Sequence, residues 1–129
     1  MRTGERVTKM NKYRNKKIKV GEKVYDSKKE MRRYQQLLLL EKNGEISDLQ
    51  MQVKYVLIPA QYSKTELTKN GKFKCLEREC VYIADFTYKD QDGQLVVEDV
   101  KSKITRQNPT YIIKRKLMLY KHGLKITEI

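Results

Sequence analysis

Two apolar segments joined by a tight turn constrain the fold of this chain more than any other feature of its sequence. The segments Ile83–Phe86 and Val96–Lys101 are rich in β-branched and aromatic side chains, which is typical of strands. Between them, Lys89–Gly93 has the polar, glycine-ended composition of a hairpin turn. The sequence therefore predicts an antiparallel pair of strands here.

Two carboxylates and a lysine fall on one face of this predicted hairpin. If residues 91–93 form a three-residue loop, with Gly93 in the left-handed conformation, Asp85 faces Asp99 directly. Cross-strand neighbours have Cβ atoms about 5 Å apart, where two carboxylates repel each other. Lys101 shares their face because side chains alternate along a strand. This combination predicts a site for a divalent cation and a reacting phosphate.

Asp85 lies in a segment that is apolar on both sides, which is typical of a central strand. Val81 and Ile83 share its face, and three apolar residues occupy the other face. A buried carboxylate without a partner is costly. A salt bridge from Asp85 to Lys101 is the structural alternative, but it leaves Asp99 on the same face without a partner. A metal ion would provide one.

A helix is predicted from Ser27 to about Asn43, where Gly44 is a good stop. Glu30 completes a capping box with Ser27, in which its carboxylate reaches back to the Ser27 amide. Helical spacing also places Glu30 in the apolar stripe that packs against the sheet. We interpret Glu30 as both a cap and a site residue. The stripe contains Met31, Tyr34, Leu37 and Leu38.

The opposite side of this helix is basic and polar, which suits contact with phosphates. It contains Lys28, Lys29, Arg32, Gln35 and Gln36, with Leu39 interrupting the face. Glu98 points away from Asp99, to the other face of the sheet, and is interpreted as a structural or partner-facing acid. Gln50 and Gln52 are interpreted as ordinary polar residues within reach of DNA.

Basic residues concentrate at the start of the chain. Its 129 residues include 29 Lys and Arg against 16 Asp and Glu, a net charge of +13. Residues 1–33 hold thirteen basic and four acidic side chains, whereas residues 34–129 hold sixteen and twelve. This imbalance favours a polyanionic partner, most simply nucleic acid, over a merely solubilising surface.

The composition also argues against several other classes of protein. No apolar run is long enough to span a membrane, and no apolar segment follows the basic N-terminus as in a secretory signal. Cys75 and Cys80 are too few for structural zinc, so we expect reduced thiols and a cytoplasmic location. His122, the single histidine, is expected near a helix end, which argues against a histidine-based nuclease or a triad hydrolase.

The first part of the chain has a mixed organisation. Residues 1–16 are expected to form a flexible basic arm, and residues 17–25 a small hairpin around Gly21. A strand is predicted over 52–58. Residues 61–79 are the least regular part and are interpreted as a loop or an inserted hairpin.

The last part completes a single domain. A second helix is predicted from Pro109, with Asn108 as its cap, to about Lys121. Gly123 then precedes a final strand over 124–129. The order α-β-β-β-α-β, with a helix crossing between the last two strands, predicts an α/β (α+β) fold. Its mixed sheet is expected to be flanked by helices and to have a parallel last pair of strands.

Asp85, the triplet Asp99-Val100-Lys101 and the helix glutamate Glu30 resemble the PD-(D/E)XK nuclease superfamily. That superfamily has a restriction-endonuclease-like αβββαβ core, the order predicted here. Archaeal-type Holliday junction resolvases and the endonuclease subunit of some transposases share this layout of acids. Ala84 stands where the name of the motif has proline, a common substitution in the superfamily.

Three segments resemble a narrower group, a small phage-encoded branch of uncharacterised nucleases. These are residues 11–17, 25–30 and 82–86. The resemblance implies that the protein acts in the cytoplasm of a phage's host.

The resemblance also implies a role for each site residue. Asp85 and Asp99 would ligate Mg²⁺ or Mn²⁺ with help from the Val100 carbonyl. Glu30 would hold a metal-bound water or a second ion, and Lys101 would orient the attacking water or stabilise charge on the phosphate. We therefore expect a metal-dependent DNA endonuclease that hydrolyses phosphodiester bonds, structure-specific for branched DNA such as a Holliday junction.

One active site cuts one strand, so a homodimer is expected if both strands are cut. We expect contacts with the DNA backbone rather than with bases. The candidate contacts are Lys12, Arg14, Lys16, Lys17, Lys28, Arg32, Lys103 and Arg106. A non-catalytic DNA-binding or packaging accessory protein with a nuclease-like fold is the alternative, although it predicts broken acids. A basic RNA-binding protein would leave the inward-facing acids unexplained.

Overall fold

The computed structural model describes residues 18–20, 23–25 and 27–129. The flexible arm predicted over 1–16 therefore lies outside the described residues. Strands β1 (Ile18–Val20) and β2 (Lys23–Tyr25) pair antiparallel. This pairing confirms the small hairpin predicted over 17–25 for its described residues.

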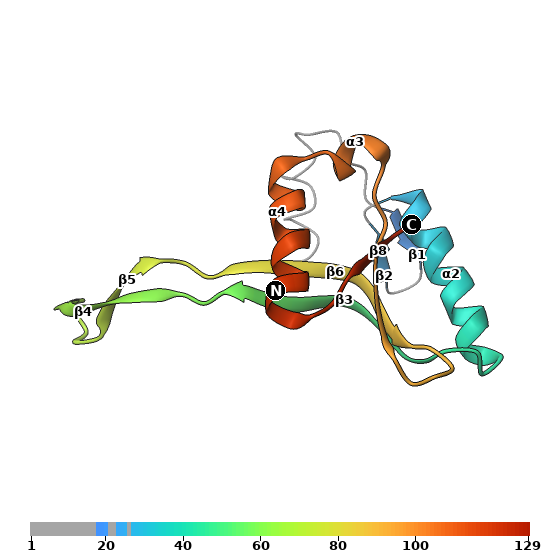
Figure 1. Cartoon of the computed structure of the whole chain (residues 1–129), viewed down its shortest axis with the longest axis horizontal. Helices are drawn as coiled ribbons and strands as arrows, with labels where there is room; N and C mark the ends of the chain where they lie inside the picture. The colour runs from blue at the N-terminus through green and yellow to red at the C-terminus, as the bar shows by residue number, and fades with distance from the viewer. Residues whose placement is uncertain (1–17, 21–22, 26) are drawn as a thin grey trace.

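A four-stranded mixed sheet forms the centre of the protein (Figure 1). It contains β3 (Ser47–Ile58), β6 (Cys80–Lys89), β7 (Leu95–Asp99) and β8 (Ile126–Glu128), in the order β3-β6-β7-β8. The first three strands pair antiparallel, and β7 and β8 pair parallel. The structure thus confirms the α/β fold class, the parallel last pair and the central position of the strand that carries Asp85.

Strand β3 begins five residues before the start predicted at Gln52. Asp48 and Gln52 both have positive φ angles, of 55° and 53°, and the pairing with β6 is irregular near Ser47. Side-chain exposure nevertheless alternates from Asp48 to Tyr55, and Leu49, Met51 and Val53 alternate with polar residues in the sequence. The period-two signal therefore extends upstream of Gln52, and the prediction began the strand too late.

Capping residues define the long helix as predicted. Helix α2 spans Lys28–Lys42, and the Ser27 side chain accepts a 3.1 Å hydrogen bond from the Glu30 amide. Gly44, with φ of 77°, follows the helix end, as expected for a residue that needs the left-handed conformation.

The second helix is also capped as predicted but is less uniform. Helix α4 spans Pro109–Leu117, and Asn108 caps it by accepting from the Tyr111 amide. It continues as a π-helical segment, η2 (Met118–His122), that ends at Gly123 in the left-handed conformation. A short helix that the sequence did not predict, α3 (Lys103–Arg106), precedes it.

Two buried clusters form the core and place one helix against each. The first cluster packs against α4 and contains Leu57, Tyr82, Ala84, Val97, Tyr111, Met118 and Ile126. The second packs against α2 and contains Leu37, Ile46, Phe86 and Tyr88. The helices therefore flank the sheet, as predicted.

Strand β6 changes sides between the two clusters. Ala84 belongs to the first cluster and Phe86 to the second, although simple alternation predicts one common face for both. Ile83 is exposed, so the apolar face predicted for Asp85 is not uniformly buried. Twist between strands is the physical reason for such a change of sides. Asp85 lies at the boundary between the two clusters.

The segment that follows β3 forms a hairpin of its own. Within the part of the chain that the structure describes, strands β4 (Gln61–Leu67) and β5 (Phe73–Glu77) pair only with each other. Figure 1 shows that they project from the body of the protein, in line with β3 and β6. This confirms the inserted-hairpin interpretation of residues 61–79. We call residues 61–77 the β4–β5 ribbon.

Candidate functional site

The β6–β7 hairpin places the two aspartates as the sequence predicts. Asp90 N donates to Gln94 O at 2.9 Å, which closes a loop of residues 91–93, and Gly93 has φ of 77°. Phe86 pairs with Glu98 in the register that follows from this loop. The next position along each strand is that of Asp85 and Asp99, so the two carboxylates are cross-strand neighbours.

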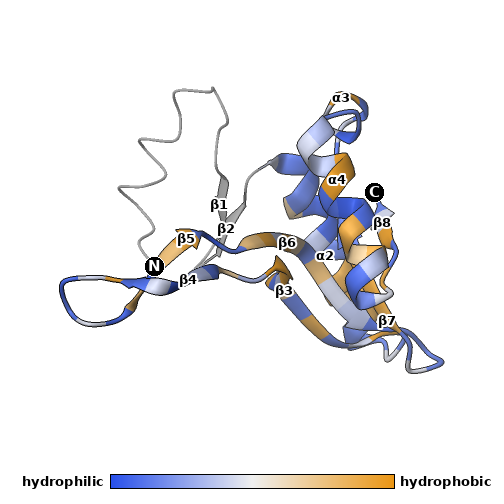
Figure 2. Ribbon diagram, turned by 60° about the vertical axis from the view of Figure 1, so that its left-hand side comes forward, coloured by the Kyte–Doolittle hydropathy of each residue, from blue (hydrophilic) through white to orange (hydrophobic). Residues whose placement is uncertain are grey.

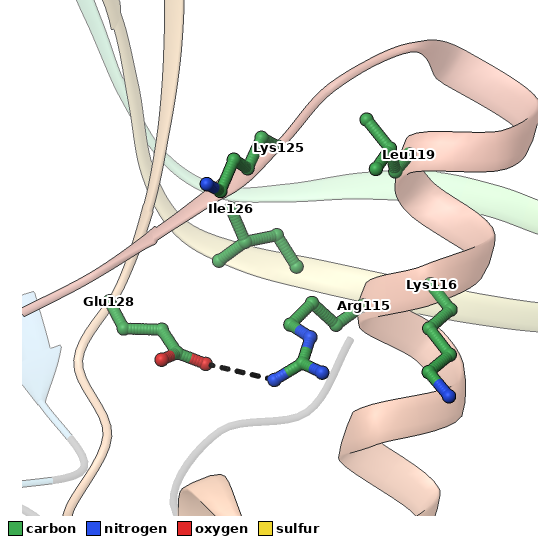
Figure 3. Close-up of a pocket in the computed structure, with 6 residues that line it drawn as sticks. All are labelled: Arg115, Lys116, Leu119, Lys125, Ile126 and Glu128. Carbon is green, nitrogen blue, oxygen red and sulfur yellow. Dashed lines mark ion pairs between the residues drawn. The ribbon is translucent and has the colours of Figure 1, made fainter.

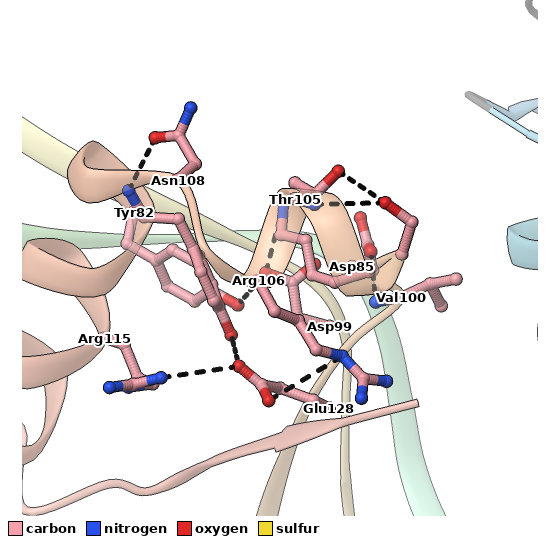
Figure 4. A network of polar contacts seen from close by, with 12 residues as sticks. Tyr82, Asp85, Asp99, Val100, Thr105, Arg106, Asn108, Arg115 and Glu128 are labelled. Atoms are coloured by element: carbon pink, nitrogen blue, oxygen red, sulfur yellow. Dashed lines mark hydrogen bonds and ion pairs between the residues drawn. The ribbon is translucent and has the colours of Figure 1, made fainter.

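Each aspartate has a defined partner (Figure 4). Asp99 is 1% exposed, and its Oδ2 accepts a 2.8 Å hydrogen bond from the Tyr82 hydroxyl. Lys101 Nζ lies 3.5 Å from the same oxygen. Asp85 Oδ2 accepts from the Val100 amide at 2.8 Å. The structural alternative of an Asp85–Lys101 salt bridge is therefore wrong, because the lysine pairs with Asp99.

Burial raises the pKa of Asp85 to about 7, and the hydrogen bond and charge of Asp99 act in the same direction. The Val100 amide and the Lys101 ammonium oppose this rise in pKa. Two carboxylates thus share one nearby lysine, which leaves the pair with excess negative charge when both are ionised. Paired carboxylate oxygens are hard ligands of the type that Mg²⁺ and Mn²⁺ prefer.

Glu30 faces inward, as its helical position predicts. It is 2% exposed, and its Oε2 accepts a 2.9 Å hydrogen bond from Gln52 Nε2. Gln52 lies opposite Asp85, between the cross-strand pairs Met51–Phe86 and Val53–Ala84. The interpretation of Gln52 as an ordinary polar residue is therefore wrong, because it links the helix glutamate to the strand that carries Asp85.

A second contact joins the start of α2 to the segment that carries Lys101. Lys29 Nζ donates to the Lys101 backbone oxygen at 3.4 Å. Among residues 27–129, no three His, Cys, Asp or Glu side chains are grouped closely enough to hold a metal ion. The part of the predicted ligand set that the structure brings together is the pair Asp85 and Asp99, next to Val100. Glu30 accepts from Gln52, whose position on β3 lies opposite Asp85.

Glu98 lies on the other face, where it has a structural role. Arg33 holds it with two hydrogen bonds, from Nε to Oε1 at 2.8 Å and from Nη2 to Oε2 at 2.6 Å. The Tyr88 hydroxyl also donates to Glu98 Oε2. The hydrogen bonds that Arg33 donates to Glu98 raise the pKa of Arg33. Burial, followed by the hydrogen bond and charge of Glu98, raises the pKa of Tyr88 to about 12. Sequence reasoning missed Arg33, since nothing local connects it to β7.

A further acid that the sequence did not predict lies beside Asp99. Glu128 is the partner of Asp99 in the parallel β7–β8 ladder, and its Oε2 accepts a 2.5 Å hydrogen bond from Tyr111. Arg106 and Arg115 lie 3.8 and 3.9 Å from its carboxylate (Figure 4). Glu128 could have been found only from the register of the parallel pair.

Tyr111 connects this network to the catalytic candidates. Lys101 Nζ lies 5.1 Å from the centre of the Tyr111 ring, within the range of a cation–π contact. Burial, followed by the hydrogen bond to Glu128, raises the pKa of Tyr111, and burial followed by the Asp99 charge raises that of Tyr82. Both phenols are therefore protonated donors at neutral pH.

A pocket rich in cations lies on the outer side of Glu128 (Figure 3). It is lined by Arg115, Lys116, Leu119, Lys125, Ile126 and Glu128. Arg115 forms an ion pair with Glu128, so its charge is partly compensated. The two lysines at the rim of the pocket are exposed.

The structure separates the predicted DNA contacts into three groups. Lys28, Arg32 and Lys103 are exposed, as a backbone contact requires. Arg106 is half-buried, and its Nε lies 3.8 Å from a carboxylate oxygen of Glu128. The remaining contacts lie outside the described residues, namely Lys12, Arg14, Lys16 and Lys17.

His122 lies at the end of η2, near a helix end as expected. His122 Nε2 lies 2.9 Å from the Val56 backbone oxygen, and its ring contacts Tyr55. Cys75 and Cys80 are free cysteines on β5 and β6. In the part of the chain that the structure describes, no helix is long and apolar enough to cross a membrane.

The fold and the site define a mixed α/β protein with a pair of aspartates and a lysine at the junction of its two central strands. The chain belongs to the family described as protein of unknown function (DUF1064), whose model matches residues 10–128. No curated protein and no solved structure matches it.

Proposed function

We propose that this protein is a metal-dependent DNA endonuclease of the PD-(D/E)XK type. The observation that carries the proposal is the juxtaposition of Asp85 and Asp99 across the β6–β7 hairpin, with Lys101 Nζ 3.5 Å from Asp99. A pair of acids in which burial, followed by the hydrogen bond and the charge of Asp99, raises the pKa of Asp85 is a poor structural device but a good receptor for a divalent cation.

Asp85, Asp99 and the carbonyl of Val100 would hold the ion. When bound, Mg²⁺ or Mn²⁺ supplies Lewis acidity toward a phosphate oxygen and lowers the pKa of a bound water. Lys101 is positioned by Asp99 and the Tyr111 ring to stabilise negative charge that develops on the phosphate. Glu30, held by Gln52, would orient a water molecule on the helix side.

The partner in this proposal is DNA, bound through its backbone. Lys28 and Arg32 on α2 and Lys103 on α3 are exposed near the site and suit phosphate contacts. A homodimer would supply the second active site for cutting both strands. Branched DNA such as a Holliday junction is the proposed substrate, and the cytoplasm is the proposed location.

Cleavage of a labelled panel of DNA substrates tests the proposal. The panel contains a four-way junction, a flap, a single strand and a plain duplex, each with Mg²⁺, Mn²⁺ or EDTA. We expect metal-dependent cutting that Asp99→Asn abolishes while DNA binding is retained. Asp92→Asn is the matched control, because Asp92 lies exposed in the hairpin loop. This variant should cleave DNA as the wild-type protein does.

A second function is favoured by one specific observation. Asp85 and Asp99 already have hydrogen-bond partners in the Val100 amide and the Tyr82 hydroxyl. A non-catalytic DNA-binding or packaging accessory protein would keep such a satisfied pair for structural reasons. Tight DNA binding without cutting under either metal would favour this function over the endonuclease.

A further inference from the structure

The β4–β5 ribbon is exposed along almost its whole length. Of residues 61–77, only Ser63 is buried, and the ribbon contributes nothing to either core cluster. An isolated two-stranded hairpin is marginally stable in water. A projecting ribbon that belongs to neither core cluster of the described residues is suited to contact another molecule.

Its outer end, residues 67–76, has a distinctive chemistry, and we call it the ribbon tip. Lys69, Lys72 and Lys74 lie within it, and it contains no Asp or Glu. Leu67 and Phe73 are cross-strand partners and are 59% and 54% exposed. In Figure 2 the loop between β4 and β5 is strongly hydrophilic, while apolar residues appear on the strands behind it. The tip therefore presents cations around an exposed apolar pair.

Local hydrogen bonds shape this tip. The Thr68 amide donates to the Lys72 oxygen at 2.7 Å, and the Gly71 amide donates to the Thr68 oxygen at 2.9 Å. The Lys72 amide also donates to Thr68 Oγ1 at 3.3 Å. Gly71 adopts a φ of 79°, which a side chain would disfavour. The three lysines of the ribbon tip therefore lie on or next to a turn of defined shape.

We propose that the ribbon tip is a second DNA contact that inserts into a groove of the duplex. The major groove admits a two-stranded β-ribbon, and apolar side chains can contact thymine methyl groups there. The three lysines would lie along the phosphates, with Leu67 and Phe73 toward the base edges. A second copy of this chain is the competing occupant. The charge of +13 argues against it, because an acid-free tip would meet a cationic surface.

The proposal rests on the proposed function for the identity of its ligand, so its test measures binding rather than cleavage. The test variant carries Lys69→Gln, Lys72→Gln and Lys74→Gln. The matched control carries Lys42→Gln, Lys89→Gln and Lys121→Gln, which remove the same charge from exposed positions outside the ribbon. Fluorescence anisotropy with a labelled duplex in EDTA, over a range of salt concentrations, gives the affinity and its salt dependence for each protein.

We expect the ribbon variant to bind at least about tenfold more weakly than the control, with a salt slope smaller by about 2 to 3, since each lost phosphate contact lowers the slope by about 0.9. Phe73→Ser should weaken binding without changing the slope, because it removes no charge. Circular dichroism of both triple variants should match wild type, because the ribbon lies outside the core.

Equal affinity and slope for the ribbon variant and the control would overturn the proposal. Sedimentation of each protein identifies the competing occupant, because dissociation of a dimer with unchanged DNA affinity would assign the tip to a second copy. The two proposals can fail separately. A protein that binds through the tip but never cuts loses only the endonuclease, whereas one that cuts but is indifferent to the tip loses only this contact.

Discussion

The side-chain amide of Gln52 donates a 2.9 Å hydrogen bond to Glu30, although Gln52 itself has a left-handed backbone with φ of 53°. A residue other than glycine in this conformation costs on the order of 1 kcal/mol or more. Such a conformation persists only where the surroundings enforce it. Here it lies opposite Asp85, so the unfavourable backbone and the buried helix acid both adjoin the site.

Replacing Gln52 with Ala tests whether this contact matters to the site. We expect the free energy of unfolding to fall by about 1 to 3 kcal/mol, because a hydrogen bond to a buried Glu30 carboxylate is lost. Under the proposed function, the cleavage rate should fall by roughly tenfold, because Glu30 would no longer be held in position. Urea unfolding and cleavage rates measure both effects. Gln50→Ala is the control, since the Gln50 side chain donates to Asp48 at the surface.

The raised pKa of Asp85 predicts an unusual dependence of stability on pH. Its pKa is about 7 in the folded protein, against an ordinary value of 3.8 for the carboxyl group, so the folded state holds more protons between these pH values. The free energy of unfolding should therefore decrease as pH rises from about 4 to 7 and then level off. Asp85→Asn should remove this component and raise stability at pH 8 by about 2 kcal/mol. An unchanged difference between the two proteins at pH 5 and pH 8 would contradict the prediction.

Divalent cations should stabilise the wild-type protein in a manner that depends on pH. Mg²⁺ or Mn²⁺ at about ten times its dissociation constant should add roughly 1.4 kcal/mol, or about 4 °C in the thermal midpoint. The shift should be larger at pH 8 than at pH 6, because protonated Asp85 is a poor ligand. Differential scanning fluorimetry measures it. Asp99→Asn should show little shift, and a full shift in that variant would place the cation elsewhere.

The ion pair between Arg33 and Glu98 should be important for stability but not for cleavage chemistry. Glu98 is 1% exposed, so Arg33→Met leaves a buried acid without its cation and should cost about 3 to 5 kcal/mol. Adding Glu98→Leu to that variant should recover most of the loss. Chemical denaturation of the single and double variants gives the comparison. A single variant within about 0.5 kcal/mol of wild type would show that Tyr88 alone satisfies the acid.

Tyr111 should act as a positioning residue for Lys101. Tyr111→Phe keeps the ring beneath the ammonium but removes the hydrogen bond to Glu128, whereas Tyr111→Leu removes both. We expect kcat to fall by roughly tenfold in the Leu variant and by much less in the Phe variant, with KM unchanged in both. Steady-state cleavage kinetics measures the two constants. Equal effects of the two substitutions would show that the hydroxyl, rather than the ring, is the important part.

Much of the fold follows from short-range patterns in the sequence. The three-residue loop ending at Gly93 fixes the register that makes Asp85 and Asp99 neighbours, because a hairpin's pairing follows from its turn. Helical periodicity likewise predicted that Glu30 faces inward, and its side chain is buried. The alternation of Leu49, Met51 and Val53 with polar residues continues upstream of Gln52, so the start of β3 could also have been predicted earlier than Gln52.

Long-range contacts were beyond such reasoning. Periodicity indicates whether a side chain faces inward but not which residue from a distant element will meet it. Periodicity can also misplace a side chain, because Leu38, which the helical pattern placed in the buried stripe, is 41% exposed. The β4–β5 hairpin was left open as a loop or a hairpin, and only the structure shows it as a projecting ribbon.

The sequence by itself determined the order of the core helices and strands, without α3 or the β4–β5 hairpin, together with the register of the central hairpin and the shared face of Asp85, Asp99 and Lys101. Tertiary structure alone decided how each acid is satisfied, with Lys101 and Tyr82 at Asp99 and the Val100 amide at Asp85. The physical reason is distance. Hydrogen bonds and ion pairs act over a few ångströms in space, and residues far apart in sequence reach that range only after the sheet and helices have packed.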